Sequence, residues 1–302
     1  MSRIHEAIRK AERENPNGKS VVPGMRQALS EFIKGEIFST RPAEQERLQG
    51  KARLMEPNPK VERKVNSDTF PLPIAHEFRL VSILAPKSVP SEQYRALKAK
   101  FYRVRNERRL KSILVTSAAP GEGKTLTAVN LALTFAQEID KKVLLIDCDL
   151  RRPSVHKLIG LDQPQGLSDF LEKKIPSSEG IVATRIPNFS VMPAGRIPEN
   201  PAELLNTQAM RDFVAASSEQ YDWVILDSPP LIPLADTETI SSMVDGIMLV
   251  VRANQTPASL ITSCVERLKG KNILGFVFNG SKLSQKSKYY YQYNYSEQSP
   301  KL

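Results

Sequence analysis

The stretch Ser112-Ile-Leu-Val-Thr-Ser-Ala-Ala-Pro-Gly-Glu-Gly-Lys-Thr125 decides the predicted fold of this 302-residue chain. Its first six residues form an apolar, β-branched run that favours a buried strand, and residues Lys124 to Glu138 have the pattern of a helix. Between them, Ala118 to Thr125 has the spacing of a phosphate-binding P-loop, or Walker A motif, with alanine in place of the usual first glycine. Because the motif lies between a strand and a helix, the sequence predicts a nucleotide-phosphate site at this turn.

The loop is expected to hold phosphate through its backbone and two side chains. Gly121 and Gly123 let backbone N–H groups turn toward an anion. Lys124 can reach the outer phosphates of ATP, and the Thr125 hydroxyl can ligate Mg²⁺. The predicted nucleotide-binding residues are Ala119, Pro120, Gly121, Glu122, Gly123, Lys124, Thr125, Leu126 and Arg151.

Two further apolar runs end in carboxylates. Val143 to Pro153 carries Asp147 and Asp149, and Val224 to Pro230 carries Asp227. Ligands gather at the carboxyl ends of parallel strands, so these side chains are expected beside the P-loop. The predicted catalytic residues are Lys124, Asp147, Asp149 and Asp227, and the predicted Mg²⁺ ligands are Thr125, Asp149 and Asp227.

Each carboxylate has an expected task. Mg²⁺ prefers a few carboxylate or hydroxyl oxygens together with phosphate and water, and an acceptor hydroxyl needs a carboxylate that takes its proton. Asp147 is the favoured proton acceptor, with Asp149 supporting the metal or the base. The alternative that one of the two caps the following helix stays open, and Arg151 and Arg152 either clamp phosphate or are merely solvated.

The order of strands and helices predicts a doubly wound, mostly parallel α/β domain over residues 90–282. Continuous apolar strands separated by helix-length segments are typical of a parallel sheet covered on both faces. The expected strands are Ser112 to Ser117, Val143 to Asp147, Phe189 to Pro193, Trp223 to Asp227, Gly246 to Val251 and Ile273 to Asn279.

The remaining segments are expected to lie outside this sheet. Residues 1–14 carry one apolar stripe and predict a short amphipathic helix, and the proline-rich residues 15–89 predict a mostly disordered tether. Ser91 to Lys111 predicts a strongly basic amphipathic helix. Residues 283–302 predict a flexible tail.

The tail carries an unusual aromatic cluster. Five of the chain's eight tyrosines lie within seven residues, after a polar stretch. Packing explains such a cluster poorly, so we interpret it as a set of modifiable hydroxyls, with a terminal edge strand or a sticky partner surface as the alternative. The predicted phosphoacceptors are Tyr289, Tyr290, Tyr291, Tyr293 and Tyr295.

Composition excludes several classes of protein. The formal charge is +10, and residues 1–111 hold 24 basic and 13 acidic side chains, so the excess lies in the first third. Two cysteines without paired or metal-ligand spacing argue against a disulfide framework or a zinc module. No apolar run approaches the ~20 residues that cross a bilayer, and residues 1–14 lack the apolar block of a secretory signal. We therefore expect a cytoplasmic chain.

These motifs together resemble the bacterial tyrosine kinases of capsule and exopolysaccharide biosynthesis, in their stand-alone cytoplasmic form. The Walker A, A′ and B motifs of that family match Ala118 to Thr125, Ile146 to Arg151 and Val224 to Asp227, and Gly195 to Leu205 is similar to a stretch between A′ and B. The resemblance implies MgATP-dependent autophosphorylation of the C-terminal tyrosines, in trans within a ring-like homo-oligomer, that regulates polysaccharide polymerisation and export.

The resemblance also implies partners. A Glu-x-x-Arg-x-x-Arg pattern bridges subunits in the family, and it matches Glu92, Arg95 and Lys98, with lysine at a position where arginine would offer a bidentate fork. A solvated face, or contact with anionic lipid or nucleic acid, is the alternative for this basic helix. A membrane polysaccharide co-polymerase is expected to recruit the chain to the inner face of the membrane, a cognate tyrosine phosphatase to reverse the reaction, and no specific nucleic acid to bind.

Two other functions remain as hypotheses. A positioning ATPase of the ParA/MinD type shares the fold and carboxylates, but its P-loop has a lysine where this chain has Ala119. The other hypothesis is a nucleotide-binding regulator of polysaccharide export that has no catalytic activity. Transfer of label from γ-labelled ATP to the protein separates the kinase from both.

Overall fold

The computed structural model describes residues 80–162 and 165–281. The predicted helix at residues 1–14, most of the predicted tether and the predicted tyrosine acceptors lie outside these ranges. The strands are β1 (Ser112–Ser117), β2 (Val143–Asp147), β3 (Val182–Ala183), β4 (Phe189–Met192), β5 (Trp223–Asp227), β6 (Gly246–Arg252) and β7 (Ile273–Asn279).

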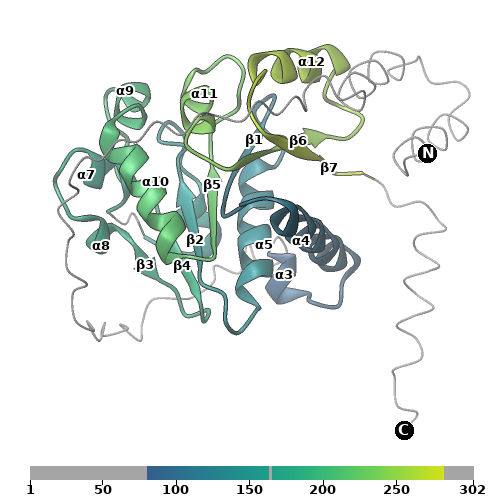
Figure 1. Cartoon of the computed structure of the whole chain (residues 1–302), viewed down its shortest axis with the longest axis horizontal. Coiled ribbons are helices and arrows are strands. Elements are labelled where there is room, and N and C mark those ends of the chain that lie inside the picture. Colours follow the sequence, from purple (N-terminus) through teal and green to yellow (C-terminus); the bar gives the residue numbers. More distant parts are fainter. Residues whose placement is uncertain (1–79, 163–164, 282–302) are drawn as a thin grey trace, which may run out of the picture. The chain divides into compact units, whose positions relative to one another are not determined.

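The seven strands form one sheet in the order β3-β4-β2-β5-β1-β6-β7 (Figure 1). Every pair is parallel except β3 with β4. All residues of β1, β2 and β5 are buried, as central strands of a covered parallel sheet should be. The predicted fold class is therefore confirmed. The two-residue antiparallel strand β3 was not predicted, because two residues carry no detectable periodicity.

Helices connect and cover these strands. They are α3 (Val81–Leu84), α4 (Val89–Glu107), α5 (Lys124–Ala136), α6 (Val155–Ile159), α7 (Leu167–Leu171), α8 (Ser177–Gly180), α9 (Pro201–Leu205), α10 (Gln208–Gln220), α11 (Asp236–Ser241) and α12 (Ala258–Arg267). Helix α5 contacts β1, β2 and β5 and also α3 and α4. Its residues are almost all buried and mostly apolar, because it lies between the sheet and a second layer of helices.

The predicted basic helix is shifted by a few residues. The sequence pattern placed it at residues 91–111, whereas α4 begins at Val89, where Ser88 accepts a hydrogen bond from the N–H of Ser91 as the N-cap. Helix α4 ends at Glu107, because the chain turns extended at Arg108 before entering β1.

The folded domain begins earlier than the sequence predicted. Leu80 is buried and Val81–Leu84 forms α3, although the tether was expected to run to residue 89. The Ser82 hydroxyl donates to the carbonyl of Asn130 at 3.0 Å and lies 2.9 Å from the Thr134 hydroxyl, which fastens α3 to α5. Five residues, four of them apolar, beside several prolines gave too short a pattern to reveal this helix.

Replacing Leu80 with alanine should therefore destabilise the domain. Deleting a buried leucine side chain leaves a cavity and lowers the free energy of unfolding by about 2–4 kcal/mol. The matched control is Leu84→Ala, because Leu84 is 39% exposed and should lose under about 1 kcal/mol. Urea unfolding followed by tryptophan fluorescence measures both variants. If Leu80→Ala unfolds at the wild-type urea concentration, residues 80–84 do not belong to the core.

An aromatic cluster joins α4 and α5 to the sheet. Trp223 is fully buried and stacks on Phe135 with ring centroids 4.1 Å apart, and Tyr102 meets Trp223 edge-on at 5.4 Å. The Arg105 guanidinium lies 4.8 Å from the centre of the Trp223 ring. At least one cation of the basic helix is therefore used in packing.

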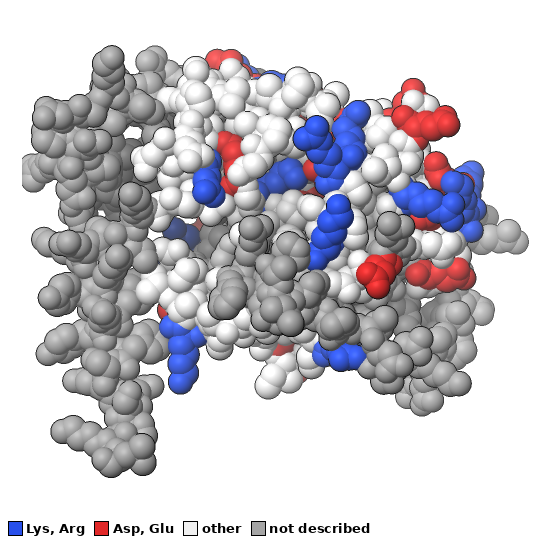
Figure 2. All heavy atoms as spheres, turned by 180° about the vertical axis from the view of Figure 1, so that it is seen from behind, with Lys and Arg blue, Asp and Glu red and all other residues white. Residues whose placement is uncertain are grey.

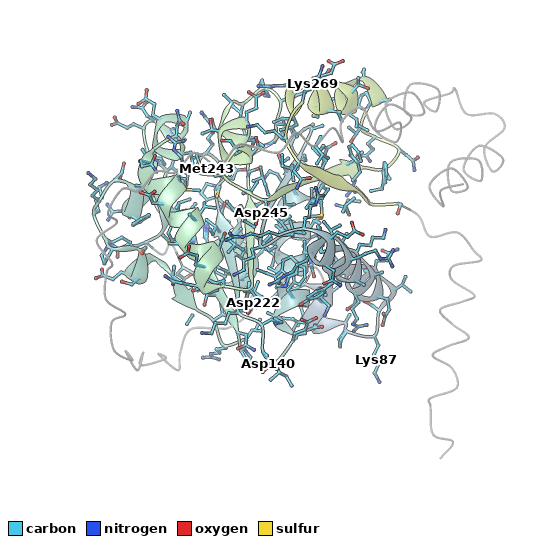
Figure 3. The ribbon with its side chains drawn as sticks, viewed as in Figure 1. Lys87, Asp140, Asp222, Met243, Asp245 and Lys269 are labelled. Carbon is cyan, nitrogen blue, oxygen red and sulfur yellow. The ribbon has the colours of Figure 1, made fainter. Side chains whose placement is uncertain are left out.

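Carboxylates at the amino ends of the strands help to fix their order. Asp245, labelled in Figure 3 just before β6, accepts hydrogen bonds from the N–H groups of Lys111 and Ser112 at 2.8 and 2.9 Å. Asp222, just before β5, accepts one from the N–H of Lys142 at 3.0 Å. These contacts hold neighbouring strands in register and leave the opposite, carboxyl ends for the site.

Candidate active site

A cleft of about 570 Å³ opens where the P-loop segment meets the carboxyl ends of the central strands. Of the predicted site residues, eight line it: Pro120, Gly121, Gly123, Lys124, Thr125, Leu126, Asp149 and Arg151. The rest of its wall is formed by Arg152, Ser154, Pro229, Pro230, Ile232, Pro233 and Leu234. Ala119, Glu122, Asp147 and Asp227 are not part of the cleft lining.

Two glycines give the P-loop its shape. Gly121 and Gly123 have φ angles of 81° and 91°, a left-handed conformation that side chains disfavour. A Cβ atom on Gly123 would also collide with the side-chain amide of Asn279. The loop can therefore present its backbone N–H groups inward only with glycine at these positions.

Contacts within and beyond the loop brace it. The N–H of Ala119 donates to Glu122 Oε2 at 3.0 Å, and Glu122 Oε1 accepts from the Thr256 hydroxyl. The Asn279 amide, at the end of β7, donates to the carbonyl of Glu122 at 2.8 Å. The side chain of Glu122 and the amide of Ala119 thus form hydrogen bonds within the protein, and Pro120 has no N–H to donate. This leaves the backbone amides from Gly121 onward as the candidates for binding a phosphate.

Lys124 lies across the cleft from the second motif, the Walker A′ stretch Ile146 to Arg151. Its Nζ is 2.9 Å from Asp149 Oδ2 and 3.3 Å from Thr125 Oγ1, and its side chain is 12% exposed. Burial lowers the pKa of Lys124, but the charges of Asp227 and Asp149 outweigh it and the net shift is upward. Lys124 therefore remains a cation, held at the cleft by Asp149.

The two carboxylates of the second motif have different surroundings. Asp147 is fully buried and accepts hydrogen bonds from the N–H groups of Asp149, Ser154 and Val155 at 3.1–3.2 Å. Asp149 faces the cleft and also accepts the N–H of Arg152 at 3.0 Å. The capping alternative that the sequence left open thus describes the contacts of Asp147, whereas Asp149 is within reach of bound molecules.

Asp227 is the most unusual carboxylate of the site. It is fully buried, lies opposite Asp147 in the pairing of β2 with β5, and neither of its oxygens has a hydrogen-bond partner in the described parts of the chain. Burial raises the pKa of Asp227, while the charge of Lys124 and the nearby Thr125 hydroxyl oppose the rise. The pKa of Asp147 is also raised. Burial is the larger cause, and the charge of Asp227 is the second.

This arrangement fits a magnesium ion. An orphaned carboxylate near a threonine hydroxyl and a phosphate-binding loop supplies the few hard oxygens that Mg²⁺ takes from proteins when phosphates and water supply the rest. Residues 80–162 and 165–281 hold no cluster of three or more histidine, cysteine, aspartate or glutamate side chains that could hold a metal ion by themselves.

Replacing Asp227 with asparagine should raise the melting temperature of the nucleotide-free protein. The change removes a buried charge whose oxygens accept no hydrogen bond from the described residues, and each kcal/mol gained is worth about 2–4 °C. The control is Asp147→Asn, which is equally buried but loses hydrogen bonds to backbone N–H groups and should lower the melting temperature. Thermal melts with and without MgATP measure both. The account of Asp227 fails if its variant melts lower than wild type and keeps the full stabilisation by MgATP.

Arg151 lines the cleft but is held on its outer side. Its Nε and Nη2 atoms lie 2.7 and 3.2 Å from the two carboxylate oxygens of Asp236, at the start of α11. The hydrogen bond with Asp236 raises the pKa of Arg151, and burial lowers it. The net shift is upward. The pairing fixes the guanidinium at the rim of the cleft.

Sequence reasoning missed several residues that shape the site. Asn279 and Thr256 brace the P-loop, and Asp236 orients Arg151. Asn279 ends a predicted strand, so its position at the carboxyl edge was a usable signal. Thr256 and Asp236 lie in loops and helix starts for which the sequence offered none.

The residues predicted to contact another subunit make contacts within the chain. Arg95 pairs with Glu92 and also donates to the carbonyl of Pro86, and Lys98 Nζ is 2.8 Å from Glu138 Oε1. Each is partly exposed. No partner copy is present, so their role between subunits stays a prediction.

Comparisons with known proteins agree with this geometry. A family model described as an AAA domain matches residues 110–269. With the parallel sheet and the P-loop, this match defines the chain as a P-loop nucleotide-binding protein. The chain is 40% identical over 215 residues to tyrosine-protein kinase YwqD of Bacillus subtilis, covering 70% of this chain and 90% of YwqD.

Solved structures point the same way. The kinase domain of Escherichia coli tyrosine kinase ETK superposes with a TM-score of 0.65 at 32% identity, covering 68% of this chain and 81% of that domain. The chimerical protein CapA2B2 superposes with a TM-score of 0.65 at 30% identity, and the match covers 68% of this chain and 91% of CapA2B2. The chain belongs to the family of bacterial tyrosine-protein kinases. The predicted family and enzyme class are confirmed, and the positioning-ATPase alternative is not favoured.

Proposed function

We propose that this kinase transfers the γ-phosphoryl group of MgATP to the C-terminal tyrosines of a neighbouring copy. The observation that carries the proposal is the pairing of Lys124 with Asp149 in the cleft beside the P-loop, together with the orphaned carboxylate of Asp227, which is buried at the end of the adjoining strand β5. The five clustered tyrosines, Tyr289, Tyr290, Tyr291, Tyr293 and Tyr295, supply hydroxyl acceptors on the same polypeptide.

The residues of the cleft would divide the work as follows. The amides from Gly121 to Thr125 hold the β- and γ-phosphates, and Lys124 leaves Asp149 to neutralise charge on the transferred group. Thr125 and Asp227 would hold Mg²⁺, directly or through water. When bound, the ion supplies charge neutralisation and alignment of the phosphate oxygens.

Proton transfer is the task of the second motif. As the tyrosine oxygen bonds to the γ-phosphorus and the bond to the β-phosphate oxygen breaks, the phenolic proton passes to a carboxylate and ADP leaves. Asp149 is favoured over Asp147 for this step, because Asp149 faces the cleft and is released when Lys124 moves. Asp147 would then position Asp149 through the hydrogen bond between them, which is 3.1 Å long.

Family membership and composition support a proposal for the cellular setting. None of the described helices could span a bilayer, and both cysteines are free and buried. We propose that the chain works in the cytoplasm at the inner face of the membrane, recruited by a polysaccharide co-polymerase. A tyrosine phosphatase would reset it, and capsule or exopolysaccharide export would be the regulated process. Contacts through Glu92, Arg95 and Lys98 would assemble a ring-like homo-oligomer.

Mass spectrometry of the C-terminal peptide tests the proposed reaction. After incubation with MgATP, the peptide that carries Tyr289 to Tyr295 should gain phosphate-sized mass increments that a tyrosine phosphatase removes. Omission of Mg²⁺ should prevent the gain. Phosphate release into solution without modification of this peptide would instead identify an ATPase.

A further inference from the structure

A second cleft, of about 780 Å³, adjoins the candidate active site. Arg152 and Ser154 line both clefts, so the two lie next to each other along the chain that follows Asp149. We call the second cleft the basic groove, because Arg152, Lys157 and Arg196 line it together with His156.

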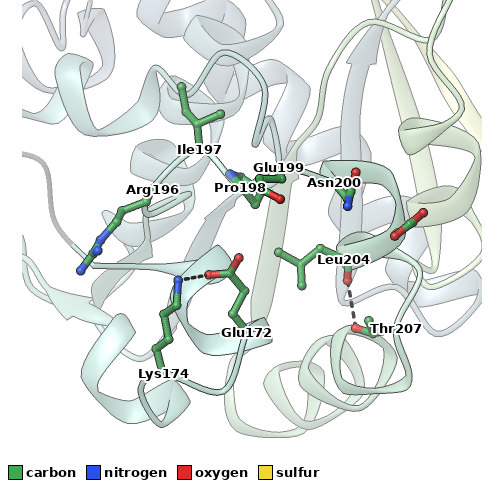
Figure 4. Close-up of a pocket in the computed structure, with 10 residues that line it drawn as sticks. Glu172, Lys174, Arg196, Ile197, Pro198, Glu199, Asn200, Leu204 and Thr207 are labelled. Atoms are coloured by element: carbon green, nitrogen blue, oxygen red, sulfur yellow. Dashed lines mark hydrogen bonds and ion pairs between the residues drawn. The ribbon is translucent and has the colours of Figure 1, made fainter.

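The charge of the basic groove is one-sided. No aspartate or glutamate is among the described residues that line it. The neighbouring cleft, of about 490 Å³, differs, since Glu172, Glu199 and Glu203 line it and its Lys174 is paired with Glu172 (Figure 4). On the face seen in Figure 2, the visible basic side chains gather into a few groups.

Arg196 and Ile197 separate these two clefts and line both. Arg196 extends away from Glu199 and Asn200 (Figure 4), and its side chain is 74% exposed, with Nε 3.5 Å from the buried Asp169. Ile197 is 65% exposed, a large value for an isoleucine. The groove thus offers a guanidinium fork, a lysine and an apolar surface, which together match a phosphorylated aromatic side chain.

We propose that the basic groove binds a phosphotyrosine of the C-terminal cluster and so retains a tail that already carries one phosphate while another tyrosine is modified. This inference rests on the proposed function, because it needs a tail that the kinase phosphorylates. The ligand is the segment around Tyr289 to Tyr295, and the groove acts as a recognition site beside the reaction cleft.

Charge complementarity identifies this occupant. Residues 282–302 contain four lysines and one glutamate, so the unmodified tail is basic and is repelled by the groove. Each phosphorylation adds about −1.5 to −2 charges and three strong acceptor oxygens. Modification therefore converts repulsion into attraction, and the first phosphate creates the ligand.

The spacing of the tyrosines suits two adjoining sites. An extended segment advances about 3.3 Å per residue, and alternate side chains share a face. Tyr291, Tyr293 and Tyr295 alternate in sequence. A phosphotyrosine in the groove would thus leave another acceptor within a few residues, near the cleft that shares Arg152 and Ser154. Later phosphates should be added faster than the first.

Peptide binding tests the groove without any need for kinase activity. Fluorescent peptides of residues 286–298, unmodified or phosphorylated at Tyr293, are titrated with the dephosphorylated full chain in the absence of nucleotide. The phosphopeptide should bind about tenfold tighter or more. The double variant Lys157→Gln/Arg196→Gln should lose most of that difference, and Lys174→Gln in the neighbouring cleft should keep it. Equal binding of the two peptides, or unchanged binding by the double variant, overturns the proposal.

A second measurement separates this inference from the proposed function. Intact-mass time courses with MgATP should show that the double variant adds its first phosphate at the wild-type rate and then accumulates as the singly modified form. If wild type and variant proceed to several phosphates alike, the groove does not retain the tail. If neither gains any phosphate, the proposed reaction fails, while the peptide titration still decides whether the groove recognises phosphotyrosine.

Discussion

Replacing Lys124 with methionine should lower the rate of self-phosphorylation by about two to three orders of magnitude. Lys124 is the one cation that bridges the P-loop and the second motif in the described parts of the chain, where its Nζ lies 2.9 Å from Asp149. Methionine keeps the length and apolar stem of the side chain but cannot offset charge on the transferred phosphoryl group. Incorporation of label from γ-labelled ATP measures the loss.

The loss must be separated from unfolding. Asp149 also accepts a hydrogen bond from the N–H of Arg152, and we expect this bond to remain in the variant, so the far-ultraviolet circular dichroism spectrum should be unchanged. Lys174→Met is the matched control, because it removes an exposed lysine that lies outside the cleft. Labelling of a folded Lys124→Met protein at the wild-type rate would overturn the assignment of the site.

Changing the five clustered tyrosines together to phenylalanine should reduce label incorporation by about tenfold or more, because phenylalanine lacks the hydroxyl that accepts phosphate. The variant leaves the cleft untouched, so its affinity for nucleotide should not change. The substituted residues are Tyr289, Tyr290, Tyr291, Tyr293 and Tyr295.

The chain supplies a control for this variant. Tyr221, at the end of α10, lies outside the cluster, and Tyr221→Phe removes one hydroxyl from the folded domain. That variant should label like wild type. Full labelling of the five-phenylalanine variant would show that the phosphate goes elsewhere and would remove the reason for the tyrosine cluster.

The central sheet could be predicted because its strands are continuous apolar runs. The strands from Ser112, Val143, Trp223 and Ile273 begin and end where the sequence placed them. The predictions were less accurate where tertiary contacts decide the outcome. Leu80 and α3 are ordered by packing on α5 and by the contacts of Ser82 with Asn130, and a short segment beside prolines does not reveal such long-range contacts.

The site could be predicted where motif and topology agree. The P-loop and Asp149 meet in one cleft, because they follow β1 and β2, two parallel strands on either side of β5 whose carboxyl ends lie at the same edge of the sheet. Periodicity and spacing do not specify which carboxylate oxygens find backbone donors. The different surroundings of Asp147, which accepts three N–H groups, and of Asp227, which accepts none from the described residues, therefore emerged only from the three-dimensional structure.

The most direct test of the central claim mixes two defective copies of the chain with γ-labelled MgATP. One copy is the full chain with Lys124→Met, which keeps its tyrosines but cannot transfer phosphate. The other ends at residue 281, so it keeps the cleft but has no tail. The account predicts strong labelling of the Lys124→Met copy when both are present and almost none of either copy alone. An unlabelled Lys124→Met copy in the mixture, or a truncated copy labelled as fully as the intact wild-type chain, would contradict it.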